Sequence, residues 1–472
     1  MMVPMGMTHI LDFWVILILL TGMWLFRDPR QARLGNLAAA FSLLAALILV
    51  LVRHRILNTD IVPIALVGGS VFGYVAARKV GMIQMPAMVA IQNGTGGAAA
   101  LLVSLVELMR SGVAADPVRG TSGVVGLVIG SLTFSGSIVA AAKLANKMRQ
   151  ASGKLPAHHF LSALTALAIL VVIIASFFLT GQTARYLYPG LIALSLLYGG
   201  LLSIRVGGAD MPVMISFLNA MTGLAAALCG MALGNRLLIA FGATVAASGT
   251  ILTYLMCKAM NRDLFRILAP RPVNEKTVPV RQPSMIAAAD SPAAAVIPSM
   301  SPTETFRRAV RLMAEARKVI VVPGYGMAIA KAQTEVVKLS ERLMARGKVV
   351  RYAIHPVAGR MPGHMNVLLA EAGVDYDMLI EMEMINPDFP NTDLVLVVGA
   401  CDVVNPAAIE VEGTPISGMP VLMVHRSKQV VCCNFDDKPG YSGVDNPLYE
   451  KDNTLLIPGD AKATIRQLLN AL

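Results

Sequence analysis

A glycine turn between an apolar segment and a helical pattern is the part of this sequence most typical of nucleotide chemistry. Residues 318–323 read Lys-Val-Ile-Val-Val-Pro and run directly into Gly324-Tyr325-Gly326, after which the apolar spacing becomes helical. Glycines at such a turn let the backbone approach a pyrophosphate at the start of a helix. This spacing alone is a weak signal, so the prediction of a dinucleotide site also depends on the loops that follow.

Polar and glycine-rich loops follow the other predicted strands of the same region. They occupy residues 355–364, 399–407 and 434–444. Ligands of open α/β sheets bind at the carboxyl ends of the strands, so these loops are candidates for ligand contact. Arg360 could neutralise a pyrophosphate, and Asp402 with Asn405 could contact ribose or carboxamide groups. Each residue alone could be an ordinary turn residue, and we predict ligand contact from their combination.

The segment after the second predicted strand lacks the acid that usually selects NAD. It reads Arg351-Tyr-Ala-Ile-His355-Pro, and no Asp or Glu follows until Glu371. In a dinucleotide fold such an acid normally bonds the ribose 2′-hydroxyl. Its absence disfavours the standard NAD contact and is compatible with a 2′-phosphate, unless the pocket wall lies elsewhere.

Alternating strand and helix patterns position these loops. We predict strands at 318–323, 348–354, 393–399, 420–424 and 429–433, and helices at 327–346, 362–373 and 460–470. A further helix of about fifteen residues, capped by Ser301-x-x-Glu304, begins the region. Apolar strands such as 394–398, with helices between several of them, indicate a parallel sheet covered on both faces. The predicted fold class of this region is therefore doubly wound, Rossmann-like α/β.

Long apolar segments fill the part of the chain that precedes this region. The sequence is 55% hydrophobic and only 15% charged, and uncharged stretches of about 20 residues fit membrane-spanning helices. We predict a polytopic α-helical membrane domain of nine helices: 10–26, 35–52, 60–77, 84–108, 121–142, 160–180, 186–204, 211–233 and 236–257. The first segment lacks the basic flank and small-residue cleavage site of a signal peptide, so we interpret it as a retained helix.

Charge and cysteine patterns bound the compartment and the partners. Lys and Arg are more numerous in the loops on one side of the predicted helices, beginning with 27–33, which places the C-terminal region in the cytoplasm. The net charge of +11 then reflects membrane topology, and without aromatic interleaving in the basic loops we expect no nucleic-acid partner. The five cysteines have no metal-type spacing, so no metal site is predicted.

Composition also suggests the domain limits. Residues 267–303 are rich in Pro, Ala, Ser and Met, which is typical of a linker. We predict a transmembrane domain at 1–262, a linker at 263–303 and a nucleotide-binding domain at 304–472.

The membrane region contains an internal repeat. The pattern Met85-Pro-x-Met, Asn93 and Gly97 recurs 126 residues later with Asn219 at the equivalent position. The copies are four predicted spans apart, so they run in the same direction. Asn93 and Asn219 either hydrogen-bond across the helices or line a water-filled ion path. No histidine lies inside a predicted span, so a proton path would use amides, water and acids at its mouths, such as Asp210.

Together these runs resemble the β subunit of the proton-translocating nicotinamide nucleotide transhydrogenases over nearly the whole chain. The resemblance is carried by Gly324-Tyr-Gly-Met-Ala, by residues 355–372, by Asp402-Val-Val-Asn-Pro-Ala-Ala, by Gly207-Gly-Ala-Asp-Met-Pro and by Met256-Cys-Lys-Ala-Met-Asn-Arg. It implies that the membrane domain conducts protons and that the C-terminal domain holds NADP(H). A separate α subunit would hold NAD(H), and hydride would pass directly between the two nicotinamides.

The resemblance also implies a location and a set of site residues. It points to a bacterial inner membrane, with lipid around the helices and a homodimer of the heteromer. The residues expected to couple hydride transfer to proton movement are Asp402, Asn93, Asn219 and Asp210. The residues expected to bind the cofactor are Gly324, Tyr325, Gly326, Val357, Ala358, Gly359, Arg360, Gly399, Asp402, Asn405, Lys438, Gly440, Tyr441, Gly459 and Asp460.

Two positions depart from the pattern of the family. Many members carry a histidine of the proton path where this chain has Asn93. The Lys-Arg-Ser stretch that grips the 2′-phosphate in the family aligns with Asn-Phe-Asp at 434–436, unless Lys438 or Arg426 substitutes for the lost cations. Two alternatives therefore stay open: a dinucleotide-gated transporter or sensor that transfers no hydride, and a divergent paralogue with altered nucleotide preference.

Overall fold

The computed structural model describes residues 5–26, 31–53, 61–81, 84–111, 116–145, 147–148, 157–179, 182–207, 210–260, 263–268, 302–359, 363–412, 414, 416–440 and 442–472. The chain forms two compact units, Met1–Tyr254 and Leu255–Leu472. Most of the linker predicted at 263–303 lies outside the described residues, so the predicted domain limits stay predictions.

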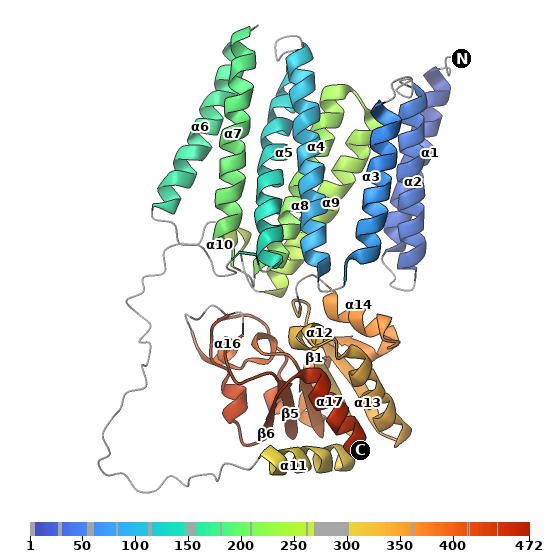
Figure 1. Ribbon diagram of the computed structural model, residues 1–472, viewed down its shortest axis with the longest axis vertical. Coiled ribbons are helices and arrows are strands. Elements are labelled where there is room, and N and C mark those ends of the chain that lie inside the picture. The colour runs from blue at the N-terminus through green and yellow to red at the C-terminus, as the bar shows by residue number, and fades with distance from the viewer. Residues whose placement is uncertain are drawn as a thin grey trace. The chain divides into compact units, whose positions relative to one another are not determined.

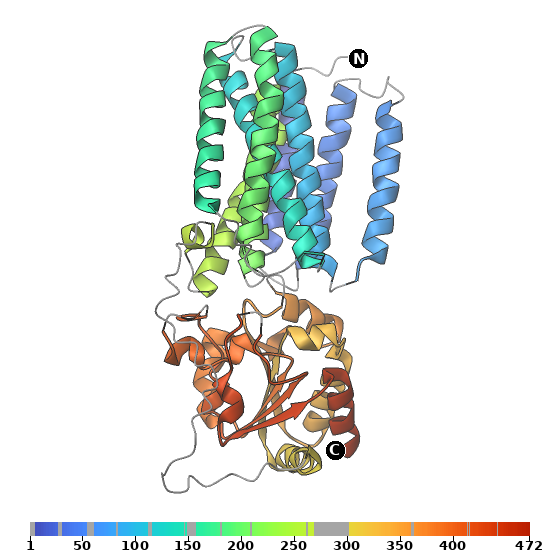
Figure 2. The same ribbon diagram turned by 60° about the vertical axis from the view of Figure 1, so that its left-hand side comes forward.

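Long apolar helices make up the N-terminal part of the chain (Figures 1 and 2). They are α1 (Met5–Leu25), α2 (Ala32–Arg53), α3 (Ile61–Lys79), α4 (Met85–Ser111), α5 (Pro117–Leu144), α6 (His158–Phe178), α7 (Gln182–Arg205), α8 (Met211–Leu233) and α9 (Arg236–Ala259). Among the described residues, eight helices are long and apolar enough to cross a membrane. The apolar stretch of α1, His9–Leu25, is shorter than these eight. The chain is thus a membrane protein with many apolar helices.

Helix α5 packs against α4, α7 and α8, and glycines make its contact with α4 close. A Cβ atom added at Gly130 of α5 would lie 2.7 Å from the backbone nitrogen of Leu101 of α4. One added at Gly97 of α4 would lie 2.9 Å from the carbonyl oxygen of Gly130. Helices in lipid gain little from the hydrophobic effect, so close approach through small residues is what lets them associate.

The internal repeat has a counterpart in the packing of the helices. Gly223 of α8 packs closely against α9, as Gly97 of α4 packs against α5. A Cβ atom at Gly223 would lie 3.0 Å from the carbonyl oxygen of Gly242 in α9. The two copies also meet at equivalent positions, because a Cβ atom at Gly96 would lie 3.0 Å from Cγ2 of Thr222, its counterpart 126 residues later. Contact between equivalent positions is what an approximate two-fold axis between the copies produces.

The second unit contains a six-stranded parallel sheet in the order β3-β2-β1-β4-β5-β6. Its strands are β1 (Lys318–Pro323), β2 (Val349–Ile354), β3 (Leu379–Glu381), β4 (Leu394–Val398), β5 (Gln429–Asn434) and β6 (Thr454–Pro458). Every residue of β4 is buried, as expected for a central strand covered on both faces. The strand order reverses between β1 and β4, and ligands of open parallel sheets bind at such a point.

Helices cover both faces of this sheet (Figure 2). The helices of the unit are α10 (Leu264–Leu268), α11 (Pro302–Glu315), α12 (Tyr325–Ile329), α13 (Gln333–Ala345), α14 (His364–Glu371), α15 (Met382–Ile385), α16 (Ala407–Glu410) and α17 (Ala461–Ala471). Helices α13 and α17 pack against each other and contact β2 and β5, respectively. Alternate strand residues such as Ile320, Val395 and Val430 form a core cluster with Phe389 and Leu422. The parallel α/β arrangement predicted from the sequence is confirmed.

One predicted strand is wrong and two strands were not foreseen. Residues 420–424 form no strand, because the Asn386 side chain bonds their backbone in place of a neighbouring strand. Its Nδ2 donates to the Val421 carbonyl oxygen at 3.1 Å, and its Oδ1 accepts the N–H of Met423 at 3.1 Å. Strands β3 and β6 lie at the two edges of the sheet, where β3 is only three residues long and β6 ends at Pro458.

The helix predicted at 327–346 is also wrong as a single element. It is divided into α12 and α13, and Lys331 between them has a φ of 51°. That left-handed backbone ends one helix before the next begins. Ser301, predicted to cap α11, lies outside the described residues.

Candidate functional site

Three glycines bring the ends of β1 and β4 together where the strand order reverses. The N–H of Gly324 donates to the carbonyl oxygen of Val398 at 2.8 Å, and the N–H of Gly326 donates to that of Gly399 at 2.8 Å. A Cβ atom at Gly324 would lie 2.2 Å from the Gly399 carbonyl oxygen, and Gly399 itself has a φ of 66°. No side chain fits between these turns, so the backbone of the protein itself requires glycine at 324.

A buried histidine anchors the loop after β2. His355 is 2% exposed, its Nε2 lies 2.8 Å from the carbonyl oxygen of Pro420, and its Nδ1 accepts the N–H of Val357 at 3.2 Å. Because one ring nitrogen donates and the other accepts, the ring is neutral with its proton on Nε2. Burial lowers the pKa of His355 to about 4. The N–H of Ala358 donates to the His355 carbonyl oxygen at 3.0 Å, so the loop backbone is held from both sides.

Gly359 brings this loop close to α14. It has a φ of 104°, and a Cβ atom there would lie 2.5 Å from Nδ1 of His364. The ring of Tyr325, the first residue of α12, has its centroid 6.3 Å from that of His364. The predicted cofactor residues of the first two loops are therefore neighbours through His364. Arg360, predicted to neutralise a pyrophosphate, lies outside the described residues.

The carboxylate of Asp402 joins the loops that follow β4 and β5. It accepts the hydroxyl of Ser442 at 2.5 Å and the backbone N–H of Ser442 at 3.1 Å. A Cβ atom at Gly440 would lie 2.8 Å from Oδ2 of Asp402, so a larger residue there would displace this carboxylate. The predicted site residues Asp402 and Gly440 are thus in contact. Tyr441 lies outside the described residues.

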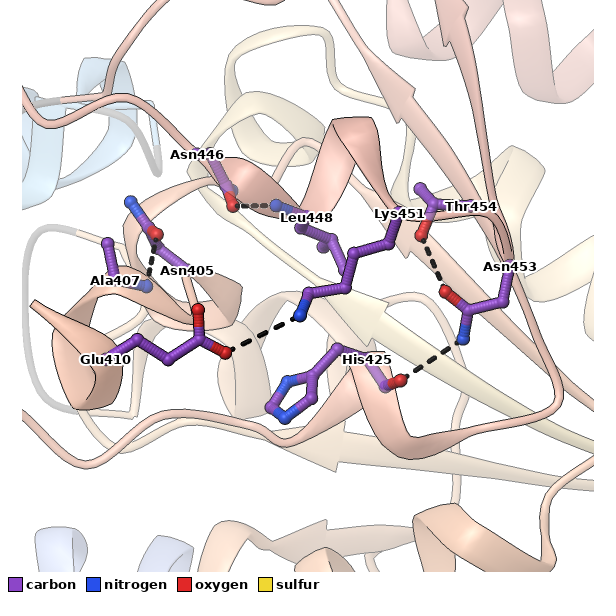
Figure 3. A network of polar contacts seen from close by, with 9 residues as sticks. All are labelled: Asn405, Ala407, Glu410, His425, Asn446, Leu448, Lys451, Asn453 and Thr454. Carbon is purple, nitrogen blue, oxygen red and sulfur yellow. Dashed lines mark hydrogen bonds and ion pairs between the residues drawn. The ribbon is translucent and has the colours of Figure 1, made fainter. Parts of the chain in front are cut away.

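Asn405 belongs to a network of amides that orders the loop after β4 (Figure 3). It is fully buried, its Nδ2 donates to the carbonyl oxygen of Asp445 at 3.1 Å, and its Oδ1 accepts the N–H of Ala407 at 2.9 Å. In the same network Lys451 pairs with Glu410 at 3.5 Å. Both polar ends of the Asn405 amide are engaged by the backbone, which favours an ordering role over the predicted contact with a ligand.

The end of β5 carries an amide and acids where the resemblance leads us to expect cations. Asn434 is 6% exposed, and its Nδ2 donates to the carbonyl oxygen of Ala400 at 2.8 Å and to the hydroxyl of Tyr449 at 2.6 Å. Its Oδ1 has no partner among the described residues. Lys438 is exposed and pairs with Asp436 at 3.8 Å, so the cation of this loop already lies beside a carboxylate.

Gly459 and Asp460 connect β6 to α17. The N–H of Gly459, which has a φ of 148°, donates to the carbonyl oxygen of Asn434 at 2.9 Å. The carboxylate of Asp460 caps α17 by accepting the N–H of Ala463 at 3.0 Å. Both residues order the carboxyl edge of the sheet, and a direct role in cofactor binding stays a prediction.

The two asparagines of the membrane repeat differ in their surroundings. Asn93 is buried, and its Nδ2 donates to the hydroxyl of Ser137 of α5 at 2.9 Å. Asn219 is half-buried and makes no side-chain hydrogen bond within the described part of the chain. The packing interpretation therefore fits Asn93, whereas for Asn219 the ion path stays a prediction. Asp210 directly precedes α8 and is half-buried, and its side chain does not cap the helix.

Two buried charges in apolar helices were missed by the sequence analysis. Asp12 of α1 is 5% exposed and pairs with Arg53 of α2 at 2.9 Å. Lys143 of α5 is 2% exposed, and its Nζ donates to the carbonyl oxygens of Ile204 and Val206. A charged residue within an apolar run is the signal that marks both, because such charges are costly in a membrane and are seldom present without a role.

The chain is thus a polytopic membrane protein that also contains a parallel α/β unit. This unit has a glycine turn where its strand order reverses. A family model described as NAD(P) transhydrogenase beta subunit matches residues 8–471. Two proteins named NAD(P) transhydrogenase subunit beta, both from Rhodospirillum rubrum, are each 39% identical over 452 residues, which is 94% of this chain and 94% of the relative. The chain therefore belongs to the NAD(P) transhydrogenase beta subunit family.

This membership confirms the resemblance that the sequence motifs suggested. It identifies the chain as one subunit of a transhydrogenase, an oxidoreductase that involves NAD(H) and NADP(H), with an alpha subunit as its partner. The alternative of a dinucleotide-gated transporter or sensor gains no support from the comparisons.

Proposed function

We propose that this chain is the part of a proton-translocating transhydrogenase that holds NADP(H) and conducts protons. Its C-terminal unit, with the Rossmann-like fold, would bind NADP(H), while the α subunit would present NAD(H). Hydride would then pass directly between the two nicotinamides. The described residues contain one parallel α/β unit of the dinucleotide-binding kind, and hydride transfer between two dinucleotides needs a second one on the partner.

The contact between the Gly324 and Gly399 turns is the observation that carries the nucleotide assignment. It lies where the strand order reverses, and the order 3-2-1-4-5-6 is that of doubly wound dinucleotide folds. The loops after β1, β2, β4 and β5 lie along the same carboxyl edge, as the contacts through His364, Asp402 and Asn434 indicate. Backbone amides and a carboxylate suit the hydroxyl, amide and pyrophosphate groups of a dinucleotide, so the residues fit this class of cofactor.

Each loop at the carboxyl edge of the sheet would have a separate role. The bound nicotinamide would supply or accept the hydride. Residues 324–326 and 357–359 would hold the pyrophosphate, with Arg360 neutralising its charge. Asp402 would lie in the loop that transmits the state of the nucleotide to the membrane helices, because its carboxylate ties together the loops after β4 and β5. Asn405, Gly459 and Asp460 would order these loops.

The membrane helices would provide the proton path. We propose nine helices, with α1 as the ninth, and a path lined by Asn219 and Asp210, beside which Asn93 packs against Ser137. The repeat supports this assignment, because paired copies with polar residues at equivalent positions are typical of transporters. The helices would lie in a bacterial inner membrane and contact its lipid, with the C-terminal domain, 304–472, in the cytoplasm. The complete enzyme would be a homodimer of the heteromer.

Titration of the purified full-length chain with NADPH and with NADH, by calorimetry, tests the nucleotide assignment. We expect tight binding of NADPH and weak binding of NADH. We also expect hydride transfer to require the α subunit, and to acidify or alkalinise sealed vesicles that contain both subunits. Binding of neither dinucleotide would contradict the proposal, and so would full transhydrogenation by this chain alone.

The acids after β5 favour a second candidate, a family member with altered nucleotide preference. Asp436 and Asp437 follow β5, and Lys438 already pairs with Asp436. A 2′-phosphate would be repelled by the carboxylates, whereas a 2′-hydroxyl could donate to them. Equal or NADH-favouring binding in the same titration would support this candidate. Replacement Asp436→Asn should then raise the affinity for NADPH, because it removes a repelling charge, and lower the affinity for NADH, because it weakens the bond to the 2′-hydroxyl.

A further inference from the structure

Lys143 is a buried amine that no step of the proposed function uses. It lies in the last turn of α5, and its Nζ donates to the carbonyl oxygen of Ile204 at 2.5 Å and to that of Val206 at 2.8 Å. These carbonyls belong to the end of α7, where backbone oxygens have no partner in their own helix. The amine therefore bonds α5 to the segment between α7 and α8.

No carboxylate compensates this amine within the described part of the chain. Its two bonds go to backbone carbonyls, and the described ion pairs do not include it. Among the helices packed against α5, α7 ends with Arg205 and α8 begins after Asp210, while the charged residues of α4, Glu107 and Arg110, lie toward the opposite end of that helix. An ammonium held away from water without a paired charge is costly, and a buried lysine readily changes its protonation state.

The hydrogen bonds of Lys143 suit both of its protonation states. An ammonium has three N–H donors and a neutral amine has two. The two carbonyls use two donors, so the third proton can leave without the loss of either hydrogen bond. A change of protonation at this position therefore does not require the helices to separate.

The same segment carries the acid proposed for the mouth of the proton path. Val206, bonded to Lys143, is followed by Gly207, whose carbonyl oxygen accepts the N–H of Asp210 at 3.1 Å. The amine thus bonds the start of the segment between α7 and α8, and the carboxylate stands at the end of this segment, where α8 begins. A proton that enters or leaves there meets one basic and one acidic group.

We propose that Lys143 is a proton-exchanging residue of the membrane domain, an inference that rests on the proposed proton path. The ammonium releases one proton, by way of water or the Asp210 carboxylate, and becomes a neutral amine that keeps its bonds to Ile204 and Val206. It then takes up a proton from the other side of the path and returns to the ammonium form. No other bond is formed or broken.

The alternative is a fixed helix cap. A permanent cation at the end of α7 would interact favourably with the helix dipole and satisfy the last carbonyls. A cap needs donors and a charge, whereas exchange needs a proton that can leave. Arginine keeps the charge and the donors but does not deprotonate in proteins, and glutamine keeps two N–H donors without a titrating group.

Variants Lys143→Arg and Lys143→Gln, each in the holoenzyme reconstituted into sealed vesicles, separate the two roles. We expect both variants to bind nucleotide and transfer hydride in detergent. In vesicles, the rate of proton movement should be at least tenfold lower with either variant than with the wild type. Exposed Lys147, just beyond α5, provides the matched control, because Lys147→Gln should pump normally.

The outcomes are distinct. Normal pumping by either Lys143 variant would overturn the proposal, and normal pumping by Lys143→Arg alone would identify a fixed cap. Lys143→Arg decides between the two roles, because it keeps the charge and the donors of a cap and does not deprotonate. If Lys143→Arg does not assemble, normal pumping by Lys143→Gln would still overturn the proposal. A wild-type holoenzyme that transfers hydride without moving protons would instead refute the proton path itself.

Discussion

The carbonyl oxygen of Pro420 lies 2.8 Å from Nε2 of His355, a ring that is 2% exposed at the end of β2. This bond joins the loop predicted to hold a pyrophosphate to the segment that follows Pro420, which lies outside the sheet. Since Nδ1 of the same ring accepts the N–H of Val357, protonation of His355 would break a bond inside the candidate site. The position of this loop therefore depends on a neutral histidine.

The second unit should lose stability as the pH falls from about 6.5 towards 4. His355 has a folded-state pKa of about 4 against an ordinary value of 6.5, so the unfolded chain binds more protons in this window. The contribution is complete above the unfolded pKa and is lost as the pH falls below it, up to about 3 kcal/mol. Denaturant unfolding of the wild type and of His355→Gln at several pH values measures it. The variant should be less stable at neutral pH and should show a shallower pH dependence; equal slopes would contradict this role.

Replacement Gly324→Ala should destabilise the second unit and weaken dinucleotide binding. Its Cβ atom would lie 2.2 Å from the Gly399 carbonyl oxygen, so the two turns would have to move apart at a cost of about 1–3 kcal/mol or more. Gly347→Ala is the matched control, because a Cβ atom there meets nothing within 4 Å and only its φ of 78° opposes the change. Thermal unfolding and NADPH titration report both effects. A Gly324 variant as stable as the control would show that the turns separate easily.

Replacement Arg360→Ala should weaken the binding of NADPH and of NADH together. A residue that neutralises the pyrophosphate acts on a group that both dinucleotides carry, and a charged hydrogen bond of this kind is worth about 1.5–3 kcal/mol. Calorimetric affinities for the two ligands provide the measurement. Lys438→Ala is the comparison, and it should affect NADPH alone if Lys438 contacts the 2′-phosphate. Unchanged affinity in Arg360→Ala would remove this residue from the site.

The two asparagines of the repeat should respond differently to replacement by leucine. Asn93→Leu removes the bond to Ser137 and leaves a buried hydroxyl without its donor, so the main loss should be stability, about 1–3 kcal/mol. Asn219→Leu breaks no described side-chain hydrogen bond, so the protein should fold and bind nucleotide while proton movement in vesicles falls. Normal pumping by Asn219→Leu would assign that residue to helix packing.

The sequence predicted the elements that depend on neighbouring residues. Each of the nine apolar segments contains a helix within the described residues, and α8 begins and ends where its segment does. Hydropathy and helix period depend only on the residues of each segment, so the sequence predicts them. Strands β1, β2, β4 and β5 and the parallel sheet were likewise foreseen from apolar runs separated by helical patterns. The family resemblance followed from the same local runs.

Only the tertiary structure decided which contacts those elements make with one another. The apolar run at 420–424 resembles a strand, yet the side chain of Asn386, distant in sequence, occupies its backbone. The sequence analysis predicted that Gly324 is a glycine so that a ligand can approach, whereas the structure shows that the backbone of Gly399 already leaves no room for a side chain there. Lys143 is marked in the sequence only as a charge in an apolar run, and the tertiary structure shows that its amine bonds the carbonyl oxygens at the end of α7. The local sequence pattern predicts where helices and strands form. Contacts between residues distant in sequence decide which polar groups are hydrogen-bonded, and the chemistry of a site depends on those contacts.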